Sequence, residues 1–460
     1  MLFSSTEFIF AFLPITVVVY FFLSRSANPL YSRFWLLFAS LFFYGWWNPK
    51  NVLLIVISMI FNFYFGSLIE SRKKHWLLAL GVIINLAVLF YFKYVDFFIS
   101  NTNSLLGADY PLLHVVLPLG ISFFTFQQIA FLVDSYQGKA GKYKFYDYCL
   151  FVTFFPQLIA GPIVHHAELM PQFEDSGNSK LNFANVTKGL FVFNMGLAKK
   201  IIIADTFAVI ANKGYSNPEV LTTLQSWATS LSYSIQLYFD FSGYSDMAIG
   251  LGLLFNVNIP FNFNSPYRAQ NIQDFWRRWH ITLSRFLRDY VYIPLGGSRK
   301  SEASTSKNLL ITFVLGGIWH GAGWTFIFWG FLHGIAQVFY RLFAKTRINI
   351  PAWAGVVITF LFINVTWIFF RAPSWHVATT ILGSIAGLTS SHEEFKLVAD
   401  FYALPIWLLG VVLLFGKSAN EWAASFTFNK KFLWLLIGLI VINCLFLNSS
   451  SSQEFLYFDF

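Results

Sequence analysis

The chain has 460 residues, 56% of them hydrophobic and only 12% charged, whereas soluble domains carry about a quarter charged residues. A water-soluble globule is therefore excluded, and the 20% of aromatic residues fits a protein with many rings at membrane interfaces. The formal charge of +9 requires no nucleic-acid partner, because membrane proteins usually carry their excess Lys and Arg in cytoplasmic loops. We therefore predict an all-α polytopic membrane protein embedded in the lipid bilayer.

The two ends of the chain carry a topology signal. No basic residue precedes the apolar run 8–23, and the first arginines follow it, so we interpret this run as a retained span rather than a secretory signal. The pair Lys430–Lys431 precedes the apolar run 432–447, and only acidic charges follow. Because basic residues stay on the cytoplasmic side, both termini are expected to be extracytoplasmic.

The apolar segments between these ends predict roughly a dozen helices, some broken or tilted, because several segments differ from the ~20 residues of a simple span. We divide the chain into amino-terminal membrane helices (1–105), a core that carries the motifs below (106–380), carboxyl-terminal membrane helices (381–448) and an extracytoplasmic tail (449–460). The sequence shows no internal repeat. Its two cysteines lie in apolar runs, so neither a disulfide framework nor a cysteine metal site is supported.

The stretch 274–290 has an apolar face and a charged face when it is drawn as a single helix. Each charge at a bilayer centre costs about 2.5–3.5 kcal/mol, so this helix is expected at the interface or along a polar cavity. One interpretation is an interfacial helix that obeys the positive-inside rule. The other is that its arginines, Arg277, Arg278 and Arg288 among them, bind an anionic donor, because a planar guanidinium suits phosphate.

The stretch 308–340 contains no Asp, Glu, Lys or Arg. As one helix it would be about 50 Å long against a hydrocarbon core of about 30 Å, so it must break, and glycines flank Trp319–His320 on both sides. An ionisable residue beside a break at membrane depth is a functional candidate by default. The alternative is that a neighbouring helix satisfies His320. We interpret His333, which has no glycine break beside it, as structural.

Other polar residues are interpreted as structural. Asp240 and Asp246 are expected to pair with the arginines of 274–290 or to cap helix ends. His165 and His166 follow a Gly-Pro pair and predict a loop, and no carboxylate cluster accompanies them in the sequence, so no metal site is predicted. The chain has neither a Gly-Lys-Ser/Thr phosphate loop nor a Gly-x-Ser-x-Gly elbow, which excludes the common nucleotidase and hydrolase patterns.

The chain ends in a serine run followed by the aromatic hexapeptide 455–460. Serines form a flexible tether, and a free end this rich in phenylalanine is expected to insert into an apolar site. Tyr457 carries the only hydroxyl group of the hexapeptide. A simple aromatic anchor at the membrane interface is the alternative.

Two histidine motifs carry a family resemblance. Residues 275–297, which begin Phe-Trp-Arg-Arg-Trp-His, and residues 317–321, Gly-Ile-Trp-His-Gly, resemble the membrane-bound O-acyltransferase family. The similarity is greatest to its bacterial alginate O-acetylase branch, which is related to the teichoic-acid D-alanyl transfer protein, and it covers essentially the whole chain. By resemblance, His320 is the catalytic histidine and His280 is the second histidine position. Donor binding is then assigned to Arg277, Arg278, Arg288 and Trp319.

The resemblance also implies a fold and a reaction. The fold is a ring of tilted and broken helices around a thin centre, with funnels from both membrane faces that meet near His320. The reaction is O-acetyl transfer with acetyl-CoA as the donor substrate and no further cofactor. His320 would act as the general base on the acceptor hydroxyl, and burial favours the neutral imidazole that a base requires.

The tail fits this resemblance. The teichoic-acid relative works with a small separate peptide whose carboxyl-terminal tyrosine motif is proposed to accept the acyl group. A similar motif is fused here, so Tyr457 is implied as an acyl relay to an exported periplasmic SGNH-hydrolase-like acyltransferase. That partner would acetylate alginate or a similar exopolysaccharide, outside the cytoplasmic (inner) membrane of a bacterium. Peptidoglycan as the acceptor and D-alanine as the acyl group stay open.

Two other classes of function compete with acyl transfer. A transporter or flippase also places ionisable residues near broken helices, but it predicts inverted repeats, which we do not find. A non-catalytic scaffold for an export complex would tolerate the loss of His320.

Overall fold

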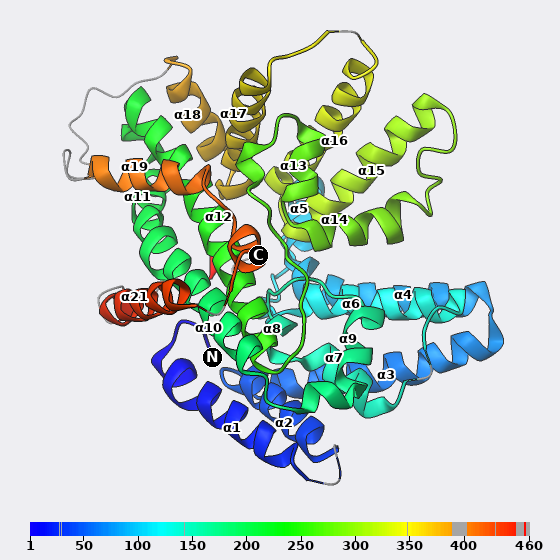
Figure 1. Cartoon of the computed structure of the whole chain (residues 1–460). Coiled ribbons are helices and arrows are strands. Elements are labelled where there is room, and N and C mark those ends of the chain that lie inside the picture. Colours follow the sequence, from blue (N-terminus) through cyan, green and yellow to red (C-terminus); the bar gives the residue numbers. More distant parts are fainter. Residues whose placement is uncertain are drawn as a thin grey trace. The chain divides into compact units, whose positions relative to one another are not determined.

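The computed structural model describes residues 1–460 except 27, 29, 142, 347, 389–402, 428, 448–454 and 457–460 (Figure 1). Within these ranges every regular element is a helix and no strand occurs, so the predicted all-α fold is confirmed. Five of the described helices are long and apolar enough to cross a membrane: α3 (Lys50–Arg72), α4 (His75–Lys93), α16 (Trp324–Phe343), α17 (Ala352–Arg371) and α21 (Lys430–Leu447).

The chain forms two compact units, each built from segments that are distant in the sequence. Unit 1 comprises residues 1–194, 244–260 and 428–436, and unit 2 comprises residues 195–243, 261–427 and 437–460. The predicted division into membrane helices, core and tail concerns the organisation in the bilayer and stays a prediction. The same holds for the ring of helices with its funnels.

Unit 1 is organised around α6 (Ile121–Gln137), which is buried along almost its whole length. Both α3 and α4 pack against it. Asn62 of α3 and Asn85 of α4 exchange hydrogen bonds of 3.1 and 2.7 Å, and Asn62 also donates to Gln128 of α6. Because apolar helices gain little from one another in lipid, these buried amides fix how the three helices pack.

The remaining helices of unit 1 are shorter. In chain order they are α1 (Leu13–Leu23), α2 (Leu30–Gly45), α5 (Val95–Leu106), α7 (Phe145–Thr153), α8 (Phe155–Leu158), α9 (His166–Glu174) and most of α10 (Phe183–Ala198).

Unit 2 contains the two histidine motifs. Its helices are α11 (Asp205–Ser216), the first part of α12 (Thr223–Leu254), α13 (Ile272–Arg278), α14 (Ile281–Leu287), α15 (Glu302–His320), α16, α17, α18 (Trp375–Ile385), α19 (Ala403–Leu414), α20 (Ala419–Ala424) and the second part of α21.

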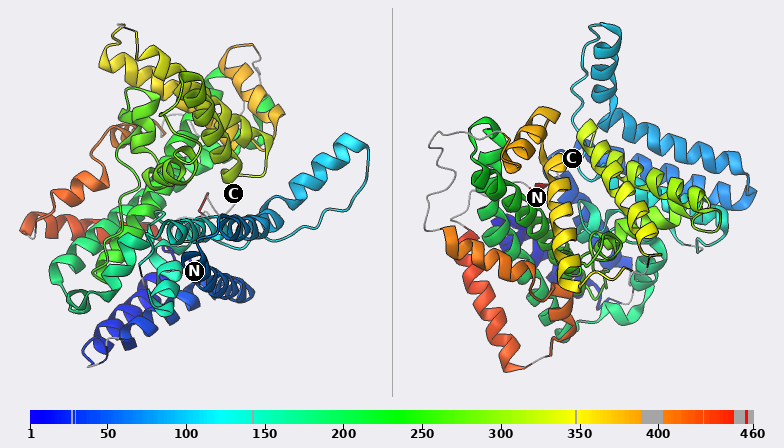
Figure 2. Two further views of the ribbon diagram at one scale, coloured as in Figure 1. Left: turned by 90° about the vertical axis from the view of Figure 1, so that its right-hand side faces the viewer. Right: turned by 90° about the horizontal axis from the view of Figure 1, so that it is seen from above.

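The break predicted inside 308–340 is confirmed. α15 ends at His320, Gly321 is extended, and α16 begins at Trp324. The two helices run side by side, as Figures 1 and 2 show from three directions. Gly317 and Gly330 face each other across this contact, where a Cβ on either would collide with a backbone carbonyl of the other helix. Glycine is required here for close approach of two backbones.

The single helix predicted over 274–290 is wrong. The chain instead forms α13 and α14, followed by a π-helical turn over Arg288–Tyr292, and it changes direction between Trp279, which is extended, and His280, which has φ = 43°. Asn262 causes the break, because its backbone carbonyl accepts from Ile281 N and its side-chain oxygen accepts from Thr282 N. These long-range bonds replace the bonds that a continuous helix would make.

Candidate functional site

His320 lies at the end of α15 in a cage of aromatic rings. Its side chain is buried, with 3% of the residue exposed. The ring of Trp329 from α16 lies 5.0 Å away, centroid to centroid, and the ring of Phe370 from α17 lies 5.2 Å away. Both rings meet the imidazole nearly edge to face, at 88° and 72°. The glycine break therefore places His320 in a buried, largely aromatic environment.

His280 is completely buried, and its tautomer can be deduced from its neighbours. Its Nδ1 lies 3.2 Å from Asn262 Oδ1, which also accepts hydrogen bonds from Thr282 N at 3.1 Å and from Thr282 Oγ1 at 2.9 Å. A backbone N–H can only donate, so the Asn262 atom is the oxygen, and His280 must carry its proton on Nδ1. Nε2 is then left with a lone pair, for which no hydrogen-bond partner lies among the described residues.

Trp319 joins the two histidines. Its ring centroid lies 6.2 Å from the imidazole of His280 and 4.9 Å from that of His320. Phe241 of α12 packs against His280, with the two ring centroids 4.7 Å apart and the ring planes at 87°. The structure therefore gathers both predicted histidines and one predicted donor-binding residue into a single buried cluster.

The predicted arginines lie outside this cluster, and two of them are engaged locally. Arg278 binds Asp274 Oδ1 at 2.8 Å, and Arg288 binds Asp289 at 2.7 Å. Arg277 is exposed and forms no ion pair within the described ranges. Donor binding by these residues and by Trp319 stays a prediction.

The expectation that Asp240 pairs with those arginines is wrong. Asp240 is buried and lies 2.8 Å from Lys200 Nζ, which also binds Asp205 Oδ1 at 2.7 Å. These three residues form what we call the charge triad. The triad also contacts the tail, because Leu456 N donates a hydrogen bond to Asp240 Oδ2 at 3.0 Å. Lys200 was not predicted from the sequence, although a lysine and an aspartate five residues apart in an apolar run were a visible signal.

The tail is only partly described. Phe455 and Leu456 are buried, as expected for an end that inserts into an apolar site. The ring of Phe455 lies 6.1 Å from that of Phe241. Tyr457, the predicted acyl relay, lies outside the described residues.

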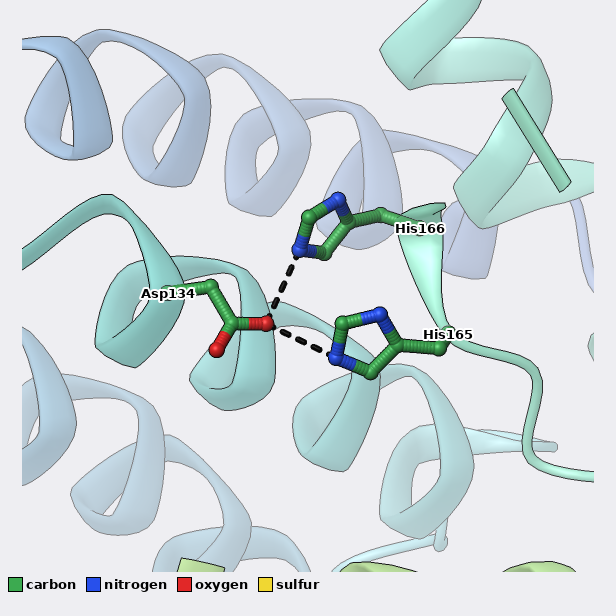
Figure 3. Close-up of side chains that lie close together, drawn as sticks. All are labelled: Asp134, His165 and His166. Atoms are coloured by element: carbon green, nitrogen blue, oxygen red, sulfur yellow. Dashed lines mark hydrogen bonds and ion pairs between the residues drawn. The ribbon is translucent and has the colours of Figure 1, made fainter. Parts of the chain in front are cut away.

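A second cluster of titratable residues occurs in unit 1. Figure 3 shows that His165 and His166, predicted as loop residues, both point toward Asp134, which lies near the end of α6. Their Nε2 atoms lie 2.8 and 2.9 Å from Asp134 Oδ2. Such atoms can bind a metal ion, but His165 Nδ1 accepts from Ala167 N at 3.4 Å, which puts the His165 proton on Nε2. This pattern favours a hydrogen-bonded clamp between α6 and α9 over a metal site.

His333 has the surroundings of a structural residue. Trp276 Nε1 donates to its Nδ1 at 3.1 Å, so Nε2 carries the proton and donates to Thr366 Oγ1 at 3.1 Å. Both ring nitrogens are thus engaged within unit 2, which agrees with the interpretation from the sequence.

Comparison with known proteins identifies the family. The profile of MBOAT, the membrane-bound O-acyltransferase family, matches residues 35–373, a range that contains both histidine motifs. The chain belongs to the membrane-bound O-acyltransferase family. It is therefore a multi-pass membrane protein and an acyltransferase, rather than a transporter or a scaffold.

Three relatives show the range of this family. A peptidoglycan O-acetyltransferase of Helicobacter pylori is 45% identical over 100% of this chain and 98% of its own length. A probable alginate O-acetylase of Pseudomonas putida is 37% identical over 100% of both chains. A teichoic acid D-alanyltransferase of Bacillus subtilis is 27% identical over 56% of this chain and 69% of its own length. These names share acyl transfer and differ in acceptor and acyl group.

Proposed function

We propose that this membrane O-acyltransferase takes acetyl from cytosolic acetyl-CoA and delivers it for the O-acetylation of an exported polysaccharide, with His320 as the general base. The observation that carries the proposal is the buried cluster of His320, Trp319 and His280 at two helix breaks. Broken helices at membrane depth are tolerated where they are buried in protein or line a cavity.

The reaction needs a base and a leaving group. His320 removes the proton of the acceptor hydroxyl, and the oxygen attacks the thioester carbonyl of acetyl-CoA. The C–S bond then breaks, and CoA leaves as a thiolate that takes up a proton. The products are an acetyl ester and CoA. General bases of this kind contribute about 10²–10⁴-fold to the rate.

His280 supplies a second function in this proposal. Because Asn262 holds the proton of His280 on Nδ1, the buried Nε2 atom can act only as an acceptor. An acceptor at that place would orient the attacking hydroxyl group toward the thioester. Orientation of this kind is a major part of rate enhancement in acyl transfer.

The donor would be held by arginines. Arg277 is exposed, and the guanidinium groups of Arg278 and Arg288 are only partly covered by their carboxylate partners. Planar guanidinium groups bind phosphate oxygens through two parallel hydrogen bonds, which suits the phosphates of CoA. Trp319 would then contact the acyl end of the donor.

The acceptor is proposed from the relatives. A relative named for peptidoglycan matches this chain over nearly its whole length at 45% identity, so peptidoglycan is the acceptor to test first. Alginate or a similar exopolysaccharide is the second candidate, because a relative named for alginate also matches over its full length. In both cases Tyr457 relays acetyl to an exported SGNH-hydrolase-like acyltransferase, and the protein lies in the bacterial inner membrane with both termini outside.

Incubation of the purified protein with radiolabelled acetyl-CoA, followed by peptide mapping, tests this proposal. We expect CoA release and label on the carboxyl-terminal peptide in the wild type, and neither in His320→Ala. CoA release without labelled protein would refute the relay through Tyr457 and leave direct transfer to a partner or glycan. If the exported partner and a peptidoglycan acceptor are added and no CoA is released, the proposed donor is wrong.

A further inference from the structure

We propose that the charge triad of Lys200, Asp205 and Asp240 is a binding site for the carboxyl-terminal segment of the chain, with Asp240 as the residue that positions Phe455 and Leu456. The ligand class is an extended peptide that offers a backbone N–H beside an aromatic side chain. The inference deepens the proposed function, because it rests on the tail's role there as acyl carrier.

The charge balance of the triad leaves Asp240 in need of a donor. One ammonium group serves two carboxylates, at 2.8 Å for Asp240 and 2.7 Å for Asp205, and all three side chains are buried. A buried carboxylate is stabilised only when its oxygens receive hydrogen bonds. Leu456 N supplies such a bond to Asp240 Oδ2 at 3.0 Å. Hydrogen bonds from a neutral N–H to a charged oxygen are among the stronger ones in proteins.

Aromatic packing adds direction to this hydrogen bond. The residue beside Leu456, Phe455, places its ring 6.1 Å from Phe241, which is itself the neighbour of Asp240 on α12. Phe241 in turn packs 4.7 Å from His280. The tail anchor is thus separated from the histidine cluster by a single ring. Tyr457, the proposed acyl carrier, is the next residue along the chain.

The two carboxylates of the triad differ in a way that provides a control. Asp205 binds the same lysine as Asp240, but no hydrogen bond joins it to Phe455 or Leu456, the described residues of the tail, and its Oδ2 has no partner among the described residues. Replacing either aspartate removes one of the two carboxylates that bind Lys200. Only Asp240→Ala also removes the acceptor of the Leu456 amide.

Hydrogen exchange at the Leu456 amide in the detergent-solubilised full chain tests the inference without any donor. We expect strong protection in the wild type, exchange at least 10-fold faster in Asp240→Ala, and a smaller change in Asp205→Ala. Phe455→Ala, which leaves the triad intact, should also accelerate exchange at Leu456, and it keeps the test valid if Asp240→Ala does not fold. Equal exchange rates in Asp240→Ala and Asp205→Ala, or no effect of Phe455→Ala, would overturn the proposal.

Labelling separates this inference from the proposed function. With radiolabelled acetyl-CoA, Asp240→Ala should lose more label from the carboxyl-terminal peptide than Asp205→Ala does. If the Leu456 amide is protected through Asp240 but the wild-type peptide takes up no acetyl, the anchoring of the tail stands and the relay through Tyr457 fails.

Discussion

His320 and His280 both stand at a break between two helices, but different forces make the two breaks. At His320 the cause is local, because Gly321 and Gly323 adopt an extended backbone that ends one helix and starts the next. At His280 the cause is remote, because Asn262, eighteen residues earlier, captures the backbone of residues 281 and 282. A residue other than glycine then adopts φ = 43°, a conformation that persists only where surrounding contacts enforce it.

The surroundings of the two imidazoles differ in the same way. His320 is enclosed by the rings of Trp319, Trp329 and Phe370, whereas His280 is held by a polar network through one amide oxygen. The amide oxygen of Asn262 fixes the tautomer of His280, because it can only accept a hydrogen bond. The proposed function gives proton transfer to His320 and orientation to His280, and the experiments below test that division of roles.

Replacing His320 should have the largest effect. We expect His320→Ala to lower the rate of CoA release by about 10²–10⁴-fold, the usual contribution of a general base, in a protein that also melts at a lower temperature because a buried ring is removed. The matched control is His333→Ala in α16, which removes hydrogen bonds to Trp276 and Thr366. This variant should also lower the melting temperature, but it should reduce the rate of CoA release far less than His320→Ala does. An equal loss of rate in both variants would argue against a special role for His320.

The His280 site should show the second largest effect. His280→Asn can keep a donor to Asn262 but has no atom at the Nε2 position, so we expect a rate loss of about 10²-fold, at the lower end of acid–base effects, in a folded protein. Asn262→Leu removes the acceptor of three hydrogen bonds and should cost about 1–3 kcal/mol of stability as well. Steady-state rates and thermal unfolding distinguish the two. Full activity in His280→Asn would show that Nε2 takes no part.

The contrast between the breaks explains what could be predicted from the sequence. The break near residue 321 was predictable because glycines beside an overlong apolar run are a local signal. The break at His280 was missed because helical periodicity over 274–290 is intact and the competing hydrogen bonds come from Asn262. The same limitation applies to ion pairs. Asp240 pairs with Lys200, and His165 and His166 pair with Asp134, through tertiary contacts that cannot be predicted from sequence spacing.

The close contact between α15 and α16 should make a moderate contribution to the stability of the fold. A Cβ at Gly330 would collide with the carbonyl of Phe313, so Gly330→Ala should destabilise the protein by about 1–3 kcal/mol, as overpacked sites do. Gly438 in α21 is the control, because no atom of the described residues lies within 4 Å of the Cβ that alanine would add, and Gly438→Ala should stabilise the protein by about 0.5–1 kcal/mol. Thermal unfolding in one detergent measures both. Equal melting temperatures would mean that the hairpin has room for a methyl group.

The smallest effect is expected where α15 begins and α16 ends, at Glu302. Hydrogen bonds from Arg341 and an ion pair with Lys345 lower the pKa of Glu302 to about 2. A carboxyl group with a lowered pKa stabilises the fold only while it is ionised. This contribution is therefore complete above the unfolded-state pKa of about 4.3 and is lost as the pH falls from there toward 2.

The pairs at Glu302 are exposed to solvent, so salt should screen them and the change in melting temperature should be small. Glu302→Gln should melt slightly below the wild type at neutral pH and low salt, and the difference should shrink below pH 4 and vanish toward pH 2, or at high salt. A difference that persists at both extremes would mean that Glu302 acts through packing rather than charge. In that case Glu302, like the contact between Gly317 and Gly330, would stabilise the packing of α15 against α16 independently of pH.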